Sequence, residues 1–256
     1  MVQRNLWSDD EMIIVLDLYF KLPFGRLNKN TPEVKALAKL IGRTDNSVAL
    51  RLVNYAACDP YILSSGRHGM ASGRDRCMPY WNQYANDKEG LFLKAEEIRA
   101  KLSKTSIEKL LDINPEDFVG KERAVVIKQR VNQLSFRAMI LGNYENKCAV
   151  TGIDIPELLI ASHIVPWSID ETNRLNPSNG ICLSPLYDKI FDKGLIGISE
   201  DYSIQLSYEL KQRAGKDFYN NHIGFIADRK LRLPIEHLPD PAFLEYHYNN
   251  IFASHN

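Results

Sequence analysis

Apolar residues recur every three or four positions in short stretches near the N-terminus, and this spacing predicts helices. The first predicted helix spans Trp7–Phe20, where Ser8 can cap the backbone and Glu11 stands three residues later, as in a capping box. The second opens at Thr31–Pro32, with proline at its first helical position, and ends at Gly42. Both helices carry one apolar face and therefore belong to a packed helical unit.

A third helix is predicted directly after the tight turn Gly42–Thr44, with Thr44 or Asp45 as its cap. Its inward face consists of Val48, Leu52 and Tyr55. Two helices joined by so short a turn match a helix-turn-helix, whose last helix can enter the major groove of DNA. The residues expected on its outer side, where they could contact bases and phosphates, are Asn46, Ser47, Arg51 and Asn54. A small helical bundle with an ordinary polar surface fits the same pattern.

The middle of the chain is poorer in periodic apolar residues. Residues 56–89 are rich in Gly, Ser, Asp and Arg, which predicts a loop, and Leu91–Leu102 is predicted as a helix. A long helix is predicted from about Glu122 to Leu141, closed by Gly142. The predicted division is a mainly helical, DNA-positioning module with a Gly/Arg-rich loop (1–104), a connector (105–119) and a second domain (120–256).

The pattern changes after Cys148 to short strands. It predicts a strand ending near Ile164, a loop, a strand at Ile181–Leu183, and a helix at Pro185–Phe191. The strings GLIGIS and YSIQLS predict a further antiparallel pair. The fold class is therefore α+β, and two strands, a loop and a helix form a ββα unit. This unit places His163 at the end of its first strand, Asn179 before the second, and Asp188 and Asp192 on one helix face.

Composition fits a folded protein of ordinary type. The chain has 256 residues, of which 45% are hydrophobic and 25% charged, so it can bury a substantial core. No apolar run reaches the roughly 18 residues of a membrane span, and the first 20 residues lack the features of a signal peptide. Its four cysteines never form a CxxC pair, which favours free thiols in a reducing cytoplasm over disulfides or a cysteine zinc site.

Net charge does not by itself point to a partner, because 32 basic residues balance 32 acidic ones. The local distribution is less even. Between Gly120 and Lys147 six basic residues stand against two acidic ones, and between Gly42 and Arg76 five arginines stand against three aspartates. Such patches can bind phosphate while acidic residues elsewhere restore neutrality. The candidate phosphate contacts outside the first module are Arg130, Arg137 and Arg174, each of which could equally serve in structural ion pairs.

The stretch from ASHIVPW to NPSNGICLSPLYDKIFDKGLIGIS resembles the HNH endonuclease family, in particular its bacterial restriction-endonuclease branch. The matching residues are His163, Asn179 and Asp188, followed by Phe191–Ile196 as FDKGLI. The last position is commonly histidine in the family, so this chain carries an H-N-D version. The upstream string RVNQLSFRAMILGNYENKCAVTG is similar to the segment that precedes the motif in this branch. The resemblance covers about residues 120–210.

The resemblance implies hydrolysis of phosphodiester bonds in double-stranded DNA with a bound Mg²⁺ or Mn²⁺. His163 can take a proton from water near neutral pH. Carboxylates suit a hard divalent cation, so Asp188 is the first and Asp192 the second predicted metal ligand. Asn179 would tie the loop across the ββα unit and orient His163, or would instead touch the metal. The string as a whole, more than the spacing of three residues, supports this interpretation.

Two departures from the family pattern leave alternatives open. Related sites often carry Asp or His directly before the histidine, where this chain has Ser162. Cys148-x-x-Thr151 and a solitary Cys182 do not form the zinc-binding pairs of many relatives, so we expect no structural zinc. The expected function is a restriction or defence endonuclease, which would cut both strands most simply as a homodimer. A DNA-binding regulator with an inactive HNH scaffold, or a nuclease acting on RNA, would carry the same string.

Overall fold

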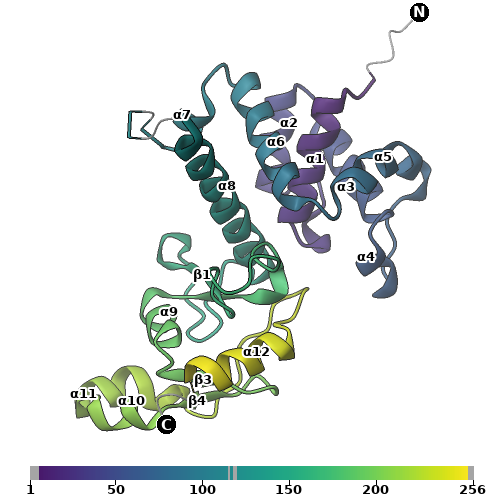
Figure 1. The fold of residues 1–256 in the computed structure, drawn as a ribbon. Helices are drawn as coiled ribbons and strands as arrows, with labels where there is room; N and C mark the ends of the chain where they lie inside the picture. Colours follow the sequence, from purple (N-terminus) through teal and green to yellow (C-terminus); the bar gives the residue numbers. More distant parts are fainter. Residues whose placement is uncertain (1–5, 115, 118–119, 253–256) are drawn as a thin grey trace, which may run out of the picture. The chain divides into compact units, whose positions relative to one another are not determined.

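The computed structural model describes residues 6–114, 116–117 and 120–252. The chain divides into two compact units, Met1–Ser135 and Phe136–Asn256, which Figure 1 colours from purple to teal and from teal to yellow. Each unit has a hydrophobic core of its own. None of the helices among the described residues combines the length and the apolar character needed to cross a membrane.

The first unit is helical. Its helices are α1 (Asp9–Lys21), α2 (Pro32–Ile41), α3 (Asp45–Ala56), α4 (Pro60–Ser64), α5 (Arg74–Tyr84), α6 (Lys88–Leu102), α7 (Ile107–Leu110) and the first part of α8 (Gly120–Asn143). Helix α1 lies at the centre, packed against α2, α3, α5 and α6. The side chains that fill this core include Ile14, Leu16, Leu52, Tyr55 and Phe92, all fully buried. Burial of this apolar surface holds the unit together.

The three helices predicted near the N-terminus are confirmed. Ser8 caps α1 through a reciprocal pair of bonds: its Oγ accepts from the backbone N–H of Glu11, whose carboxylate accepts from the backbone N–H of Ser8. Gly42 ends α2 in the left-handed conformation, with φ of 68°. A side chain there would be strained, so glycine lets the backbone turn sharply into α3.

The prediction that Arg51 and Asn54 lie on the outer side of α3 is wrong. Both side chains are buried: α5 packs over Arg51, and the segment Met70–Gly73 that leads into α5 packs over Asn54. The Arg51 guanidinium lies 4.9 Å from the centre of the Trp7 ring and 3.8 Å from Cys77 Sγ, and the Asn54 amide donates to the carbonyl of Met70. Arg51 therefore serves the packing of this unit and is not presented to DNA.

The predicted loop at residues 56–89 is largely structured. Helices α4 and α5 lie within it, and a 3-10 turn at Ala71–Gly73 leads into α5. Pro79 stands inside α5 without ending it. The segment is held to α3 by bonds such as that from the Arg74 Nε to the carbonyl of Ala57. Residues 65–70 form the longest irregular connection of this stretch, between α4 and the 3-10 turn.

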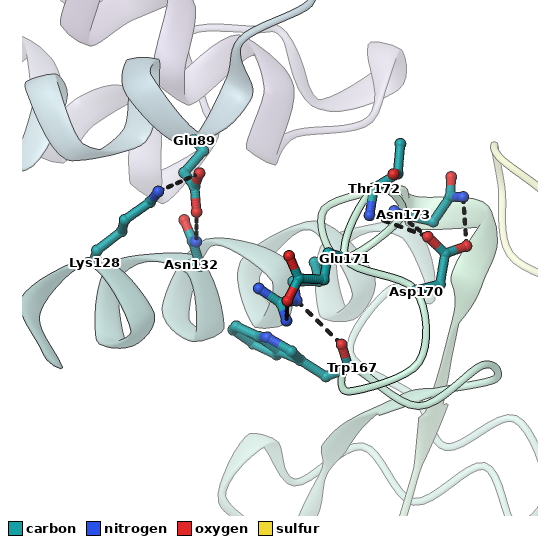
Figure 2. A network of polar contacts seen from close by, with 9 residues as sticks. Glu89, Lys128, Asn132, Trp167, Asp170, Glu171, Thr172 and Asn173 are labelled. Atoms are coloured by element: carbon teal, nitrogen blue, oxygen red, sulfur yellow. Dashed lines mark hydrogen bonds and ion pairs between the residues drawn. The ribbon is translucent and has the colours of Figure 1, made fainter. Parts of the chain in front are cut away.

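The two compact units divide inside α8, between Ser135 and Phe136. The functional division into 1–104, 105–119 and 120–256 stays a prediction. Polar contacts explain why the first part of α8 belongs to the N-terminal unit. Figure 2 shows the Glu89 carboxylate bound by Lys128, at 2.7 Å, and by the Asn132 amide. Arg123 forms an ion pair with Glu108, a buried residue of α7.

The second unit contains two small antiparallel sheets. Strands β1 (Ile160–His163) and β2 (Gly180–Leu183) pair with His163 opposite Gly180, and α9 (Pro185–Asp192) follows. Strands β3 (Ile196–Ile198) and β4 (Ile204–Leu206) form the second pair. The remaining helices of this unit are α10 (Tyr208–Arg213), α11 (Lys216–Phe218) and α12 (Pro241–His247). The predicted ββα unit and the predicted hairpin after it are confirmed.

Gly180 allows the first sheet to lie close to the last part of α8. A Cβ atom at this position would stand 2.4 Å from Ile140 Cδ1 and 2.7 Å from Phe136 Cζ. Both side chains are buried, so neither could move aside without disturbing the core. The absence of a side chain at Gly180 therefore brings Phe136 against the sheet, next to the end of β1.

Candidate active site

His163 ends β1 and is half-buried. Its ring stacks on Phe136, with ring centroids 3.8 Å apart and an angle of 10° between the planes. The edge of Trp167 lies across it, at 5.8 Å between centroids. These two aromatic side chains hold the imidazole in one orientation. Burial lowers the pKa of His163, against the opposing effect of its hydrogen bond to a carbonyl.

The hydrogen bond of His163 defines its tautomer. Nε2 lies 3.0 Å from the carbonyl oxygen of Arg174. A carbonyl can only accept, so Nε2 carries the proton and Nδ1 of the neutral ring keeps its lone pair. Among the described residues Nδ1 has no hydrogen-bond partner. A half-exposed imidazole with a free lone pair and a lowered pKa is equipped to take up a proton.

Asn179 lies in the short 3-10 segment Pro177–Asn179 directly before β2 and is fully buried. Its Oδ1 accepts from the backbone N–H of Val165 at 2.8 Å, and its Nδ2 donates to the carbonyls of Val165 and Asn173. Both ends of the amide are therefore used within the loop between the two strands. This arrangement matches a side chain that ties the loop and leaves no amide atom for a metal.

The loop between β1 and β2 is further held by its own polar side chains, shown in Figure 2. Asp170 accepts from the backbone N–H groups of Thr172 and Asn173 and from the Asn173 amide. The Arg174 guanidinium donates to the Trp167 carbonyl and to Glu171, and lies 5.3 Å from the Trp167 ring. Arg174 thus contributes its carbonyl to His163, while its charge is largely engaged inside the loop.

Asp188 and Asp192 stand one turn apart on α9, as the sequence predicts. Asp188 is half-buried and Asp192 exposed. Neither carboxylate forms a hydrogen bond or ion pair with another described residue. Desolvation by neighbouring atoms, followed by the negative charge of Asp188, raises the pKa of Asp192. Two unpaired carboxylates that repel each other are a donor set suited to a divalent cation.

Among the described residues no third ligand completes this pair. Within the described part of the chain, no three His, Cys, Asp or Glu side chains come together as a metal-binding group. Ser162 is buried and its Oγ has no hydrogen-bond partner. Because successive residues of a strand face opposite sides, Ser162 lies on the other side of β1 from His163. The structure thus separates Ser162 from the histidine that it precedes.

Helix α9 is fixed by contacts that the sequence pattern does not announce. The Cys148 Sγ accepts from the backbone N–H of Ser184, the capping residue of α9, at 3.2 Å. The Tyr187 hydroxyl donates to the carbonyl of His222, and His247 Nε2 lies 3.1 Å from the carbonyl of Phe191. Cys148 also accepts from the N–H of Thr151. A thiol that receives two backbone donors is a structural acceptor, and no spacing rule in the sequence indicates it.

The predicted phosphate contacts have different surroundings. The Arg137 guanidinium donates to the carbonyls of Leu159 and Pro156, which fixes the segment leading into β1. Arg130 is exposed on the N-terminal part of α8 and has no polar partner among the described residues. On α3, Asn46 is exposed and Ser47 half-buried, with its backbone N–H bound to the Thr44 cap. Arg130 and Asn46 are thus the two of these side chains most open to solvent.

The comparison with known protein families agrees with this geometry. The family model of the HNH endonuclease matches residues 148–199. The matched segment contains β1, β2 and α9, and with them His163, Asn179, Asp188 and Asp192. No curated protein matches the chain.

Proposed function

Because residues 148–199 are an HNH endonuclease segment, we propose that this chain is a divalent-metal-dependent endonuclease that hydrolyses phosphodiester bonds in double-stranded DNA. Its proposed role is restriction or defence. The observation that carries the proposal is the state of His163: Nε2 is committed to the Arg174 carbonyl, and Nδ1 is left as a free base. An inactive HNH scaffold would not require an imidazole with one nitrogen fixed by a hydrogen bond and the other left unprotonated.

In the proposed reaction His163 is the general base. Its Nδ1 takes a proton from the water that attacks phosphorus, while Nε2 keeps its own proton and donates it in a hydrogen bond to the Arg174 carbonyl. The carbonyl also stabilises the positive charge that the ring then acquires. A pKa lowered by burial keeps the ring neutral, and so competent as a base, at neutral pH. Phe136 and Trp167 keep the ring plane fixed during the transfer.

Asp188 and Asp192 are the proposed ligands of Mg²⁺ or Mn²⁺. Their oxygen donors fit such an ion, and water or substrate phosphate would supply the remaining ligands, as is usual for Mg²⁺. The chemistry that a bound divalent ion supplies in phosphodiester hydrolysis is neutralisation of charge on the phosphate and on the departing 3′ oxygen. Asn179 is a positioning residue, which acts by holding the loop that presents the Arg174 carbonyl.

The alternative function, a DNA-binding regulator with an inactive HNH scaffold, is favoured by one observation. The described residues offer two carboxylates at this place and no third ligand. Two carboxylates nevertheless suit a Mg²⁺ ion, which keeps several of its water ligands when it binds a protein. The two functions differ in what the purified protein does to DNA in the presence of metal.

The test is cleavage of plasmid and of modified phage DNA by wild type and His163→Ala, with Mg²⁺ or Mn²⁺. Loss of a general base is expected to slow cleavage by about 100- to 10,000-fold. His68→Ala is the matched control, because His68 is exposed in the N-terminal unit. Metal-dependent cutting that survives His163→Ala would contradict the assigned base. Tight, salt-sensitive binding without cutting by either protein would favour the regulator.

A further inference from the structure

A basic hollow in the second unit has a lining that includes neither His163 nor the two carboxylates of α9. It has a volume of about 410 Å³. Three cationic side chains line it from one short stretch, Arg229, Lys230 and Arg232, and Thr151 lines it from the turn after Cys148. The described residues that line it include no acidic side chain. We call these four residues with their hollow the Arg229–Arg232 surface.

The backbone of this stretch is fixed on the unit rather than free. The carbonyl of Arg229 accepts from the N–H of Ile204 at 2.8 Å, and Lys230 pairs with Ser203 in an antiparallel bridge. The N–H of Arg232 donates to the carbonyl of Ala149 at 2.8 Å. Between the two cations the side chain of Leu231 is buried. Because Leu231 faces inward, Lys230 and Arg232 project from the opposite side of the extended backbone.

The charges of the surface are mostly uncompensated. Arg232 is exposed, and no described residue forms an ion pair or hydrogen bond with its guanidinium. Arg229 lies 5.6 Å from the centre of the Phe225 ring, which leaves its guanidinium available. Lys230 alone has an acidic partner, the exposed Asp201 at 3.6 Å. Cations held close together without acidic partners repel one another, and a bound anion lowers this electrostatic repulsion.

Thr151 connects this surface to the candidate active site. Its Oγ accepts from the N–H of Ile153, and its hydroxyl also hydrogen-bonds the Cys148 thiol, an interaction that helps lower the pKa of Cys148 against the effect of burial. The N–H of the same residue donates to Cys148 Sγ, the atom that also receives the N–H of Ser184 at the start of α9. One turn therefore contributes to the hollow and, through one sulfur atom, holds the helix that bears Asp188 and Asp192.

We propose that the Arg229–Arg232 surface binds the sugar–phosphate backbone of the DNA substrate, beyond the phosphodiester that is cleaved. An arginine guanidinium can donate two parallel hydrogen bonds to the oxygens of one phosphate. Contacts of this kind position the duplex and carry no sequence information. The proposal deepens the proposed function, because it names the surface by which the nuclease unit holds its substrate.

The test is the salt dependence of DNA binding, measured by fluorescence anisotropy with a labelled duplex. Both variants are made in the His163→Ala background, so that cleavage does not intervene. Arg229→Gln with Arg232→Gln removes two charges and keeps the backbone bonds of the stretch. Lys211→Gln with Lys216→Gln is the matched control, because both lysines are exposed in the same unit and the charge lost is equal.

Two lost phosphate contacts should reduce the slope of log K against log salt by about 2 and weaken binding on the order of tenfold, equally for unrelated sequences. The control pair should leave the slope within about 0.5 of the parent. An unchanged slope in Arg229→Gln/Arg232→Gln, with both variants melting like the parent, would overturn the proposal. So would a parent protein that binds no duplex at low salt.

The outcome is separable from that of the proposed function. Suppose that the wild type never cuts DNA, and that the arginine pair shows a smaller salt slope than its parent. The surface is then supported and the nuclease function fails. If wild type cuts DNA while the arginine pair, in the His163→Ala background, binds duplex as tightly as its parent and with the same salt slope, the nuclease function is supported and the surface fails.

Discussion

The imidazole of His163 lies parallel to the ring of Phe136, with 3.8 Å between the ring centroids. Phe136 comes from α8 and His163 ends β1, so one side chain of the long helix covers one face of the proposed base. This cover is part of the burial that lowers the pKa of His163. It also leaves the ring edge, with Nδ1, as the accessible part.

We expect Phe136→Leu to move the acid limb of the pH–rate profile upwards. The neutral ring is the active form, so activity is lost as the pH falls through the pKa of His163. Removing the stacked ring lets water reach the imidazole, and its pKa returns towards the ordinary 6.5. The rate at neutral pH should also fall, by up to about 100-fold, because the ring is less well oriented.

The measurement is kcat/KM for DNA cleavage between pH 5 and 8, a range chosen around the ordinary histidine pKa of about 6.5. Phe252→Leu is the control, since Phe252 is equally buried in the same unit but packs against Gly197. It should lower thermal stability without moving the acid limb. If the acid limb of the pH–rate profile lay at the same pH in Phe136→Leu as in wild type, the stack with Phe136 would not set the pKa of His163.

Removal of the α9 carboxylates should weaken metal binding. Asp188→Asn and Asp192→Asn each delete one unpaired carboxylate, and we expect the affinity for Mn²⁺ to fall on the order of tenfold for each. Electron paramagnetic resonance of free Mn²⁺ measures this without requiring cleavage. Asp201→Asn, which removes an exposed carboxylate of the same unit, should bind as wild type. Equal Mn²⁺ affinity in all three variants would place the metal elsewhere.

Variants of α3 should separate packing from DNA contact. Arg51→Gln breaks the contacts of a buried guanidinium with Trp7 and Cys77, so we expect the free energy of unfolding to fall by about 1–2 kcal/mol. Asn46→Ala removes an exposed side chain and should leave stability unchanged. If the outer face of α3 contacts DNA, Asn46→Ala weakens duplex binding. Urea denaturation and anisotropy on the two variants distinguish these effects.

The elements that the sequence predicts well depend on local information. The cap made by Ser8 and Glu11, the turn at Gly42 and the ββα pattern are each encoded within a few residues, and all three occur in the structure. His163, Asn179 and Asp188 are found because the string around them is specific. For such features the neighbours in sequence are also the physical partners.

The predictions from sequence are wrong where an element distant in the chain covers the predicted surface. Arg51 and Asn54 fall on the polar side of a helical wheel, but a wheel does not reveal that α5 and the segment leading into it cover this side. The sequence does not predict α5 as a helix, because a glycine-rich segment precedes it and Pro79 lies inside it. In the candidate site, the Phe136 stack depends on the close approach that Gly180 permits, which is a relation between α8 and β2. No local pattern announces it.

His247 is a buried histidine that should make the stability of the second unit depend on pH. It ends α12, is 2% exposed, and stacks on Phe191 with ring centroids 3.8 Å apart. Its Nε2 donates to the Phe191 carbonyl, and its buried Nδ1 has no hydrogen-bond partner. Burial outweighs the effect of the carbonyl and lowers the pKa of His247 to about 4. The ring is therefore neutral in the folded protein at neutral pH.

The unfolded chain takes up a proton at this residue near pH 6.5, whereas the folded chain does so only near pH 4. The stability that His247 contributes is therefore complete above pH 6.5 and is lost as the pH falls towards 4. At pH 5 the loss should be about 2 kcal/mol relative to pH 7. His247→Gln should lack this part of the acid dependence, while His68→Gln, which alters an exposed ring, should keep it. The measurement is urea denaturation of the three proteins at pH 5 and pH 7. If wild type and His247→Gln lost the same free energy of unfolding between the two pH values, His247 would titrate alike in the folded and unfolded states, and the prediction would be wrong.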